Sequence, residues 1–256
     1  MSESIETYFD LIPTDLLNII VSHLVNSDDL ENFGLSYASL ISLLNWSVIH
    51  FLHFGFFIND VDYNEYLKKF QVEKLIKVLK LRYTIEELLK LQVLNLSNNR
   101  SKNISKEIGI LSNLQALYLG GNQLTNIPKE IGNLIKLKEL HLSHNQLKNI
   151  PDDIYNLSNL QALYLNSNQL KKISKEIGNL SNLQKLNLDN NQITEIPEEI
   201  GNLNNLTYLD LNNNQLTKIP KEIGNLINLQ ALTLNDNQIT EIPEEIRKLI
   251  NLKIYT

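Results

Sequence analysis

The chain contains no cysteine, one tryptophan, one methionine and six prolines among 256 residues. Without cysteine there can be no disulfide framework, no thiolate zinc site and no catalytic thiol. An excess of positive charge is also lacking, because 23 basic and 29 acidic residues of mixed order give a net charge of −6. A nucleic-acid-binding surface needs clustered basic residues, so the composition predicts no nucleic-acid partner.

The first 60 residues also lack a clear targeting signal. No basic region followed by an apolar core and a small-residue cleavage site opens the sequence, so we expect no signal peptide. Residues 32–59 carry no charged side chain, and 40–58 is long enough to span a bilayer. Polar side chains recur within that segment, which favours buried helices and leaves a membrane-anchored protein as an alternative. They are Ser42, Asn45, Ser47, His50 and His53.

A 23-residue period runs through the rest of the chain. Seven full repeats cover residues 91–251 without an insertion or deletion, and 252–256 begin an eighth. A period of this length predicts a solenoid of stacked coils, in which each coil is stable only against its neighbours. The leucines that open the repeats are Leu91, Leu114, Leu137, Leu160, Leu183, Leu206, Leu229 and Leu252.

Within each repeat, the apolar pattern predicts a short strand and a return segment. Counting from the opening leucine, positions 3 to 7 form the strand, and the leucines at positions 4 and 6 point inward. Apolar residues at positions 11, 14, 18 and 21 return the chain along the convex side. Proline at position 15, as at Pro128, suits the start of a short helical turn because its φ is preset and an N–H is not needed there.

Position 9 is asparagine in every full repeat. We expect this turn residue to be buried, and a buried amide is tolerated only where its donors and acceptor are satisfied. Bonds to the backbone of neighbouring coils would join these side chains into a structural ladder. Its expected members are Asn99, Asn122, Asn145, Asn168, Asn191, Asn214 and Asn237.

The spacing L-x-x-L-x-L-x-x-N-x-L resembles that of leucine-rich repeat proteins, and 127–134 resemble the I-P-x-x-I-G-N-L form of intracellular members. Four residues depart from the pattern: Ser101 replaces an apolar residue, Ser105 and Ser174 replace proline, and Tyr155 replaces glycine. The resemblance implies an α/β leucine-rich repeat solenoid, with a curved parallel β-sheet and a short helical or irregular convex side. Extracellular members usually carry cysteine-rich caps, so it also implies a cytoplasmic location, in a host's cytoplasm if the chain is viral.

The outward strand positions form the candidate binding surface, because repeats of this geometry bind partners on the concave sheet. Tyrosine offers a large contact area at little entropic cost, so we expect a protein partner there. The alternative is that exposed strands simply favour tyrosine. The predicted partner-binding residues are Tyr118, Glu139, His141, His144, Tyr164, Lys185, Asp189, Tyr208 and Asp210.

Catalytic, metal and cofactor sites are not indicated by the sequence. His141 and His144 share the expected concave side, but two histidines without a third ligand do not predict a metal site. Glutamate pairs beside the prolines are repeat residues on the convex side and lack a partner for acid–base chemistry. No nucleophile–base set stands out, so we expect a protein that is not an enzyme and binds no cofactor.

The N-terminal segment 1–60 does not share the repeat. Residues 11–24, followed by Asp28, Asp29 and Leu30, resemble the opening of an F-box, although the cysteine and closely spaced tryptophan usual after this point are missing. The resemblance implies a small α-helical domain that binds a Skp1-type adaptor of a ubiquitin ligase, while the repeats select the substrate. The residues that it places against the adaptor are Ile12, Pro13, Leu16, Leu17, Ile20 and Leu24.

Residues 61–90 complete the domain organisation as a linker and a degenerate N-terminal capping repeat. The whole chain resembles leucine-rich repeat proteins of giant DNA viruses and amoebae, some of which have F-box-like heads. We therefore expect a substrate-recognition adaptor for ubiquitin ligation. The alternative is a plain intracellular scaffold in which the N-terminal helices only cap the solenoid.

Overall fold

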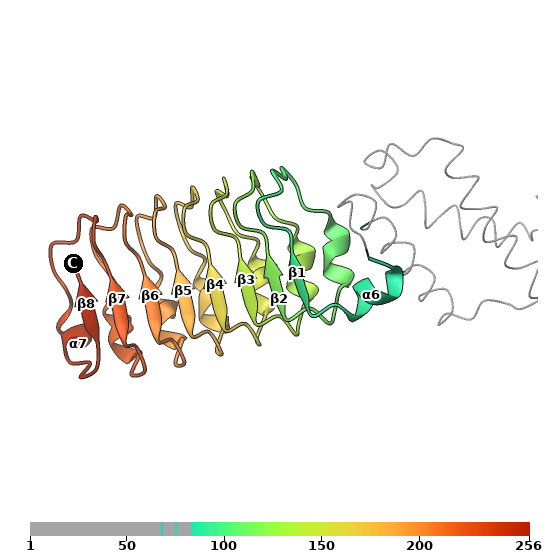
Figure 1. Ribbon diagram of the computed structural model, residues 1–256. Coiled ribbons are helices and arrows are strands. Elements are labelled where there is room, and N and C mark those ends of the chain that lie inside the picture. Colours follow the sequence, from blue (N-terminus) through green and yellow to red (C-terminus); the bar gives the residue numbers. More distant parts are fainter. Residues whose placement is uncertain (1–67, 69–74, 76–82) are drawn as a thin grey trace, which may run out of the picture. The chain divides into compact units, whose positions relative to one another are not determined.

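The computed structural model describes residues 68, 75 and 83–256. The F-box-like segment with its six predicted adaptor-binding residues, the uncharged segment 40–58 and most of the predicted linker lie outside the described residues. The repeats form the predicted solenoid of stacked coils, with strands on one side and short helices on the other (Figure 1). Within the described part of the chain, no helix has the length and hydropathy that a membrane crossing requires.

The strands form one parallel sheet of eight, in sequence order from β1 to β8. Each strand pairs with the next residue for residue, so Leu94 lies beside Leu117 and Leu117 beside Leu140. From β1 to β7 this register follows from the constant repeat length, because equal repeat positions meet in neighbouring coils. The last pair differs: Ala231 lies beside Lys253 and not beside Ile254 as the period predicts, so β8 is shifted by one residue. The strands are β1 (Val93–Asn95), β2 (Ala116–Tyr118), β3 (Glu139–His141), β4 (Ala162–Tyr164), β5 (Lys185–Asn187), β6 (Tyr208–Asp210), β7 (Ala231–Thr233) and β8 (Lys253–Tyr255).

The strands are three residues long and end at repeat position 5, two positions earlier than the sequence pattern predicts. Backbone pairing continues past them, since the Leu96 N–H donates to the Tyr118 carbonyl at 2.8 Å and the Asn98 N–H to the Gly120 carbonyl at 2.9 Å. Position 8 then takes positive φ in every repeat, from Asn98 at 59° to Asp236 at 54°. This left-handed residue turns the chain out of the sheet, which explains why position 8 carries short polar residues, glycine or histidine.

Six 3-10 helices and two short α-helices are described on the return side of the coils. Each 3-10 helix begins directly after position 15, where Pro128 has φ −68°, so the predicted helix-opening role of proline is seen. The first α-helix, α6, starts with a capping box between Thr84 and Glu87. The helices are α6 (Ile85–Lys90), η1 (Lys106–Ile110), η2 (Lys129–Asn133), η3 (Asp152–Asn156), η4 (Lys175–Asn179), η5 (Glu198–Asn202), η6 (Lys221–Asn225) and α7 (Glu244–Arg247).

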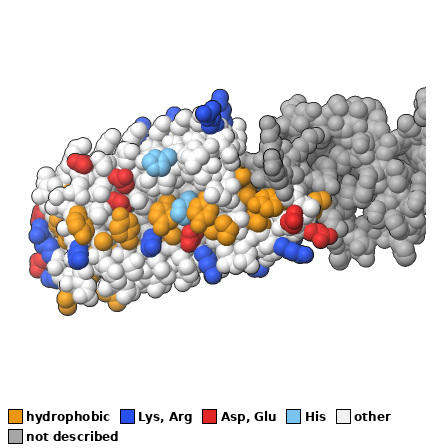
Figure 2. All heavy atoms as spheres, in the orientation of Figure 1, with side chains coloured by type: hydrophobic (Ala, Val, Ile, Leu, Met, Phe, Trp, Pro, Cys, Tyr) orange, Lys and Arg blue, Asp and Glu red, His pale blue; other side chains and the backbone are white. Residues whose placement is uncertain are grey.

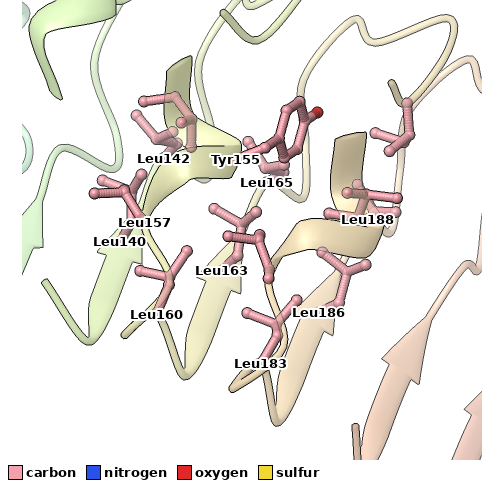
Figure 3. Close-up of a cluster of buried hydrophobic side chains, with 14 of the residues drawn as sticks. Leu140, Leu142, Tyr155, Leu157, Leu160, Leu163, Leu165, Leu183, Leu186 and Leu188 are labelled. Atoms are coloured by element: carbon pink, nitrogen blue, oxygen red, sulfur yellow. The ribbon is translucent and has the colours of Figure 1, made fainter. Parts of the chain in front are cut away.

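The core is a continuous stack of leucine and isoleucine layers between the sheet and these helices. Figure 3 shows part of it, with Leu140 and Leu142 from one coil beside Leu163 and Leu165 from the next. All four side chains are buried. Because a layer is completed only by its neighbours, the burial that stabilises each coil, about 25 cal/mol per Å² of apolar surface, comes largely from the interfaces between coils.

Glycine at position 19 lets consecutive helices approach closely. A Cβ atom on Gly201 in η5 would lie 2.6 Å from the carbonyl oxygen of Glu222 in η6. Tyr155 takes this position in η3 and is buried, with 2% of its surface exposed (Figure 3). Neighbouring 3-10 helices elsewhere lie closer together than η3 and η4 do, so the coils separate to accept the ring.

The pKa of the Tyr155 phenol connects this ring to a second departure from the repeat. Burial raises that pKa to about 12, while a hydrogen bond with the backbone of Ser174 acts to lower it. Only a backbone N–H can donate to the phenol oxygen, and donation is what lowers a phenol pKa. Ser174 occupies a proline position, and proline has no N–H. Tyr155 and Ser174 therefore depart from the repeat together, because the phenol of one uses the backbone N–H that the other retains.

Asparagine side chains at position 9 form a ladder along the buried turn. In Asn168, Nδ2 donates to the carbonyls of Leu142 and Leu165, and Oδ1 accepts from the Leu147 N–H, each at 3.0 Å. The same bonds recur from Asn122 to Asn237. Asn99 departs from the expectation: its side chain is exposed, and its backbone N–H donates to Oδ1 of Asn122 at 3.1 Å.

A second asparagine ladder, which the sequence analysis missed, runs along position 23 on the surface. Asn159 Nδ2 donates to the Ile135 carbonyl, and Asn182 Nδ2 to the Ser158 carbonyl, both at 2.8 Å. Lys136 interrupts this row, and its Nζ donates to Asn113 Oδ1 at 2.8 Å. The signal was present in the sequence, because asparagine also recurs at this position of the repeat.

Candidate functional site

The candidate site is the outer face of the sheet, made by repeat positions 3 and 5; we call it the concave face. Figure 2 shows a stripe of hydrophobic side chains that crosses the strands on this face, interrupted by one histidine and a few charged groups. Position 4 points into the core, so the side chains on either side of it must point outward. The concave face consists of Val93, Asn95, Ala116, Tyr118, Glu139, His141, Ala162, Tyr164, Lys185, Asn187, Tyr208, Asp210, Ala231, Thr233, Lys253 and Tyr255.

Three rings stack at the centre of this face. The His141 ring lies between Tyr118, at a centroid distance of 4.4 Å, and Tyr164, at 4.3 Å. The cause is the in-register sheet, because neighbouring strands are about 4.8 Å apart and equal positions therefore meet. The result is a partly exposed aromatic stack, formed by Tyr118, His141 and Tyr164, across β2, β3 and β4.

Glu139 holds one side of the aromatic stack. Its Oε2 accepts a hydrogen bond from the Tyr118 hydroxyl at 3.1 Å and lies 3.3 Å from His141 Nε2. Burial first, and then the bond to this carboxylate, raise the pKa of Tyr118. Tyr118 therefore stays a neutral donor, and its bond to Glu139 orients the ring.

Asp210 forms a second polar cluster with Tyr208 and Thr233. The Tyr208 hydroxyl donates to Asp210 Oδ2 at 2.8 Å, and the Thr233 hydroxyl donates to Oδ1. The Asn212 N–H also donates to Oδ1, at 3.2 Å. Burial, followed by the bond to Asp210, raises the pKa of Tyr208 to about 12. Asp210 is buried, so it supports Tyr208 from below the surface and does not face a partner as the sequence analysis expected.

Lys185 lies between these two clusters and is exposed. It pairs in register with Ala162 on one side and with Tyr208 on the other. A shallow depression of about 450 Å³ opens here. Its lining residues are Tyr164, Lys185, Asn187, Thr207, Tyr208, Gln230 and Ala231.

His144 and Asp189 lie in the turns that follow the strands, away from the stripe. His144 has φ 55°, so its place is set by the left-handed turn. Asp189 Oδ1 accepts a hydrogen bond from Asn213 Nδ2 at 3.0 Å. No group of three or more metal-ligating side chains was found among the residues that the structure describes.

Thr233 and Asn187 also belong to the site, although they are not among the predicted partner-binding residues. Thr233 fixes the buried carboxylate of Asp210, and Asn187 lines the depression. The signal that could have revealed both is their column, because they occupy the same repeat position as Tyr118, His141 and Tyr164. Their side-chain types alone do not predict a role in binding.

Comparison with protein families assigns the architecture. A family model described as a leucine-rich repeat region matches residues 42–197 and 197–255. The chain belongs to the leucine-rich repeat family. The match to this family begins at residue 42, inside the segment whose sequence we interpreted as helical, whereas the regular repeats begin at Leu91. None of the curated proteins compared with the chain matches it.

Solved structures of other leucine-rich repeat proteins resemble the repeats. Internalin C2 from Listeria monocytogenes is 31% identical with a TM-score of 0.55, and the match covers 73% of this chain and 92% of that one. The ectodomain of the Arabidopsis thaliana receptor kinase GASSHO1/SCHENGEN3, in complex with CASPARIAN STRIP INTEGRITY FACTOR 2, is 38% identical with a TM-score of 0.61 over 66% of this chain.

The plant peptide hormone receptor RGFR1, in complex with RGF2, is also 38% identical with a TM-score of 0.61 over 66% of this chain. The matched segment spans 21% of the GASSHO1/SCHENGEN3 chain and 28% of the RGFR1 chain. These likenesses support a protein-interaction fold for the repeats. The factor and the hormone bound in the two plant structures are ligands of those receptors.

Proposed function

We propose that this leucine-rich repeat protein holds a protein partner on its concave face, centred on the aromatic stack of Tyr118, His141 and Tyr164. The observation that supports this most is the stack itself, because its three rings contact one another and remain partly exposed at the centre of the hydrophobic stripe. Aromatic side chains are enriched among residues that dominate binding energy, and these rings lose little entropy on binding because they are already positioned.

The likeness to GASSHO1/SCHENGEN3 and RGFR1, each solved in complex with a factor or hormone, also supports a partner on the repeats. The F-box-like segment supports a finer proposal, in which the chain is a cytoplasmic substrate-recognition adaptor that recruits a ubiquitin ligase through a Skp1-type protein. Tyr208 and Lys185 then belong to the substrate surface, and Asp210 keeps Tyr208 in place.

The concave-face proposal is tested by proximity labelling with the full-length chain. In one variant Tyr118, His141 and Tyr164 are all replaced by alanine; Tyr208 is left intact because its hydroxyl pairs with buried Asp210. The control replaces Ile135 and Ile227, which are exposed hydrophobic residues at position 22 and outside the concave face, by alanine. The first variant should lose the labelled partners of the wild-type chain and the control should keep them, with similar melting temperatures. Loss in both, or in neither, contradicts the proposal.

The adaptor proposal has a separate test, a pull-down with purified Skp1-type adaptor. Binding by the full chain that disappears when Pro13 and Leu16 are replaced supports the ubiquitin-ligase role. Absence of binding leaves the alternative of a plain scaffold. The concave-face experiment is unaffected by either outcome, because the two surfaces are tested by different variants.

A further inference from the structure

The depression around Lys185 contains hydrogen-bond donors that have no partner in the structure. Lys185 forms no ion pair within the described residues, and the Tyr164 hydroxyl forms no hydrogen bond there. Asn187 uses its Oδ1 to accept from the Asp189 N–H at 2.9 Å, which leaves its Nδ2 as a donor. All three side chains line the same depression.

The two carboxylates of this face, Glu139 and Asp210, are in contrast already engaged. Glu139 accepts from Tyr118 and lies against His141. Asp210 accepts from Tyr208, Thr233 and the Asn212 N–H. The depression therefore has unpaired donors while both carboxylates of the face are engaged, and a ligand that brings an acceptor pairs with those donors.

We propose that the depression binds a carboxylate carried by a peptide segment of the protein partner, with the carboxylate against Lys185 and apolar side chains on Tyr164 and Tyr208. This deepens the proposed function and rests on it. The lysine ammonium is the single cation among the seven residues that line the depression. It can pair with one carboxylate, and hydrogen bonds to charged groups are the stronger ones.

A single carboxylate fits better than a phosphate or a run of acidic residues. The Asp210 carboxylate lies beside the depression, because it accepts a hydrogen bond from Tyr208, which lines it. Like charges at this range repel a dianion more than a monoanion. The small side chain of Ala231 and the in-register Ala162 leave room beside Tyr208 and Lys185 for the ligand's own side chains.

The test uses the full chain to select phage-displayed random 12-residue peptides, which are then synthesised. The selected peptides should share an aspartate, a glutamate or a free C-terminus, and neutralising that group by Asn, Gln or amidation should weaken binding at least tenfold. The neutralised position shows whether the carboxylate comes from a side chain or from the C-terminus. Lys185→Glu should lose these peptides, and Lys185→Arg should keep them.

Lys253→Glu is the matched control, because Lys253 is also an exposed lysine on the concave face, where it pairs with Ala231 of position 3. This variant should bind the selected peptides as the wild type does. Peptides that need Tyr164 yet bind Lys185→Glu as well as wild type would overturn the carboxylate site while leaving the proposed function intact. The carboxylate site is also overturned if every peptide that the wild type selects is selected by the triple aromatic variant as well. The labelling experiment then tests the proposed function independently.

Discussion

Replacing Ser174 by proline is expected to destabilise the protein, even though five repeats carry proline at this position. The backbone would accept it, since Ser174 has φ −66° and Pro128 has φ −68°. Proline would, however, remove the N–H that the buried Tyr155 phenol uses. Proline, the usual residue at repeat position 15, should therefore be unfavourable at position 174.

The magnitude follows from two opposing effects. Leaving the buried phenol without its donor costs about 1–3 kcal/mol. Proline restricts the unfolded chain, which returns about 0.4–1 kcal/mol where the native φ is compatible. The net loss expected for Ser174→Pro is on the order of 1–2 kcal/mol, the difference between these effects.

Urea unfolding followed by far-ultraviolet circular dichroism measures this loss as a lower midpoint. Ser105→Pro is the control: Ser105 also replaces proline at φ −66°, and its hydroxyl donates to Glu107 as that of Ser174 donates to Glu176. The preceding helix, α6, has no tyrosine, so Ser105→Pro loses only the serine–glutamate bond that both substitutions remove, and it should destabilise by about 1–3 kcal/mol less than Ser174→Pro.

The decisive comparison is Ser174→Pro in a Tyr155→Phe background. Without the phenol there is no acceptor to lose, so Ser174→Pro should then cost no more than Ser105→Pro does. Equal effects of Ser174→Pro with Tyr155 and with phenylalanine would refute the coupling. Stabilisation by Ser174→Pro in the wild-type chain would refute it as well.

Three further predictions concern the same array. The pKa of Tyr155 is raised from 10 to about 12, so the stability that its neutral phenol contributes is complete below pH 10 and falls as pH rises to 12. Over that window the free energy of unfolding of wild type, measured in urea, should fall by about 2–3 kcal/mol more than that of Tyr155→Phe, and parallel profiles would contradict this. Asn168→Ala leaves the buried Leu147 N–H without an acceptor and removes one of the two asparagine donors from each of the Leu142 and Leu165 carbonyls, so it should cost about 1–3 kcal/mol in chemical unfolding, whereas Asn99→Ala at the exposed end should cost under about 1 kcal/mol. Gly201→Ala places a Cβ 2.6 Å from a backbone oxygen and should lower the melting temperature by several degrees, while Gly120→Ala, with 3.3 Å, should change it little; equal shifts would show that the coils can separate freely.

Much of the fold could be read from the sequence because the repeat is strict. A constant period sets the register of the first seven strands, and apolar positions identify the core without any knowledge of neighbouring coils. The period does not predict the shift of β8 by one residue. Strand length could not be read in this way. It depends on the left-handed turn at position 8, whose occupants share a backbone conformation and little else. The pairing of Tyr155 with Ser174 was equally hidden, because each is an isolated departure until the coils are stacked.

For the site, the sequence by itself identified which side chains share the concave face, since that follows from alternation and from the period. Only the tertiary structure decided their roles. Asp210 is covered and bonded from three sides, Glu139 is bonded by its neighbours, and Lys185 is left exposed without an ion-pair partner in the described region. Burial and hydrogen bonding depend on what the adjacent coils place beside each residue. The repeat spacing predicts which residues lie on the concave face. The neighbouring coils determine which of those residues remain exposed and available to bind.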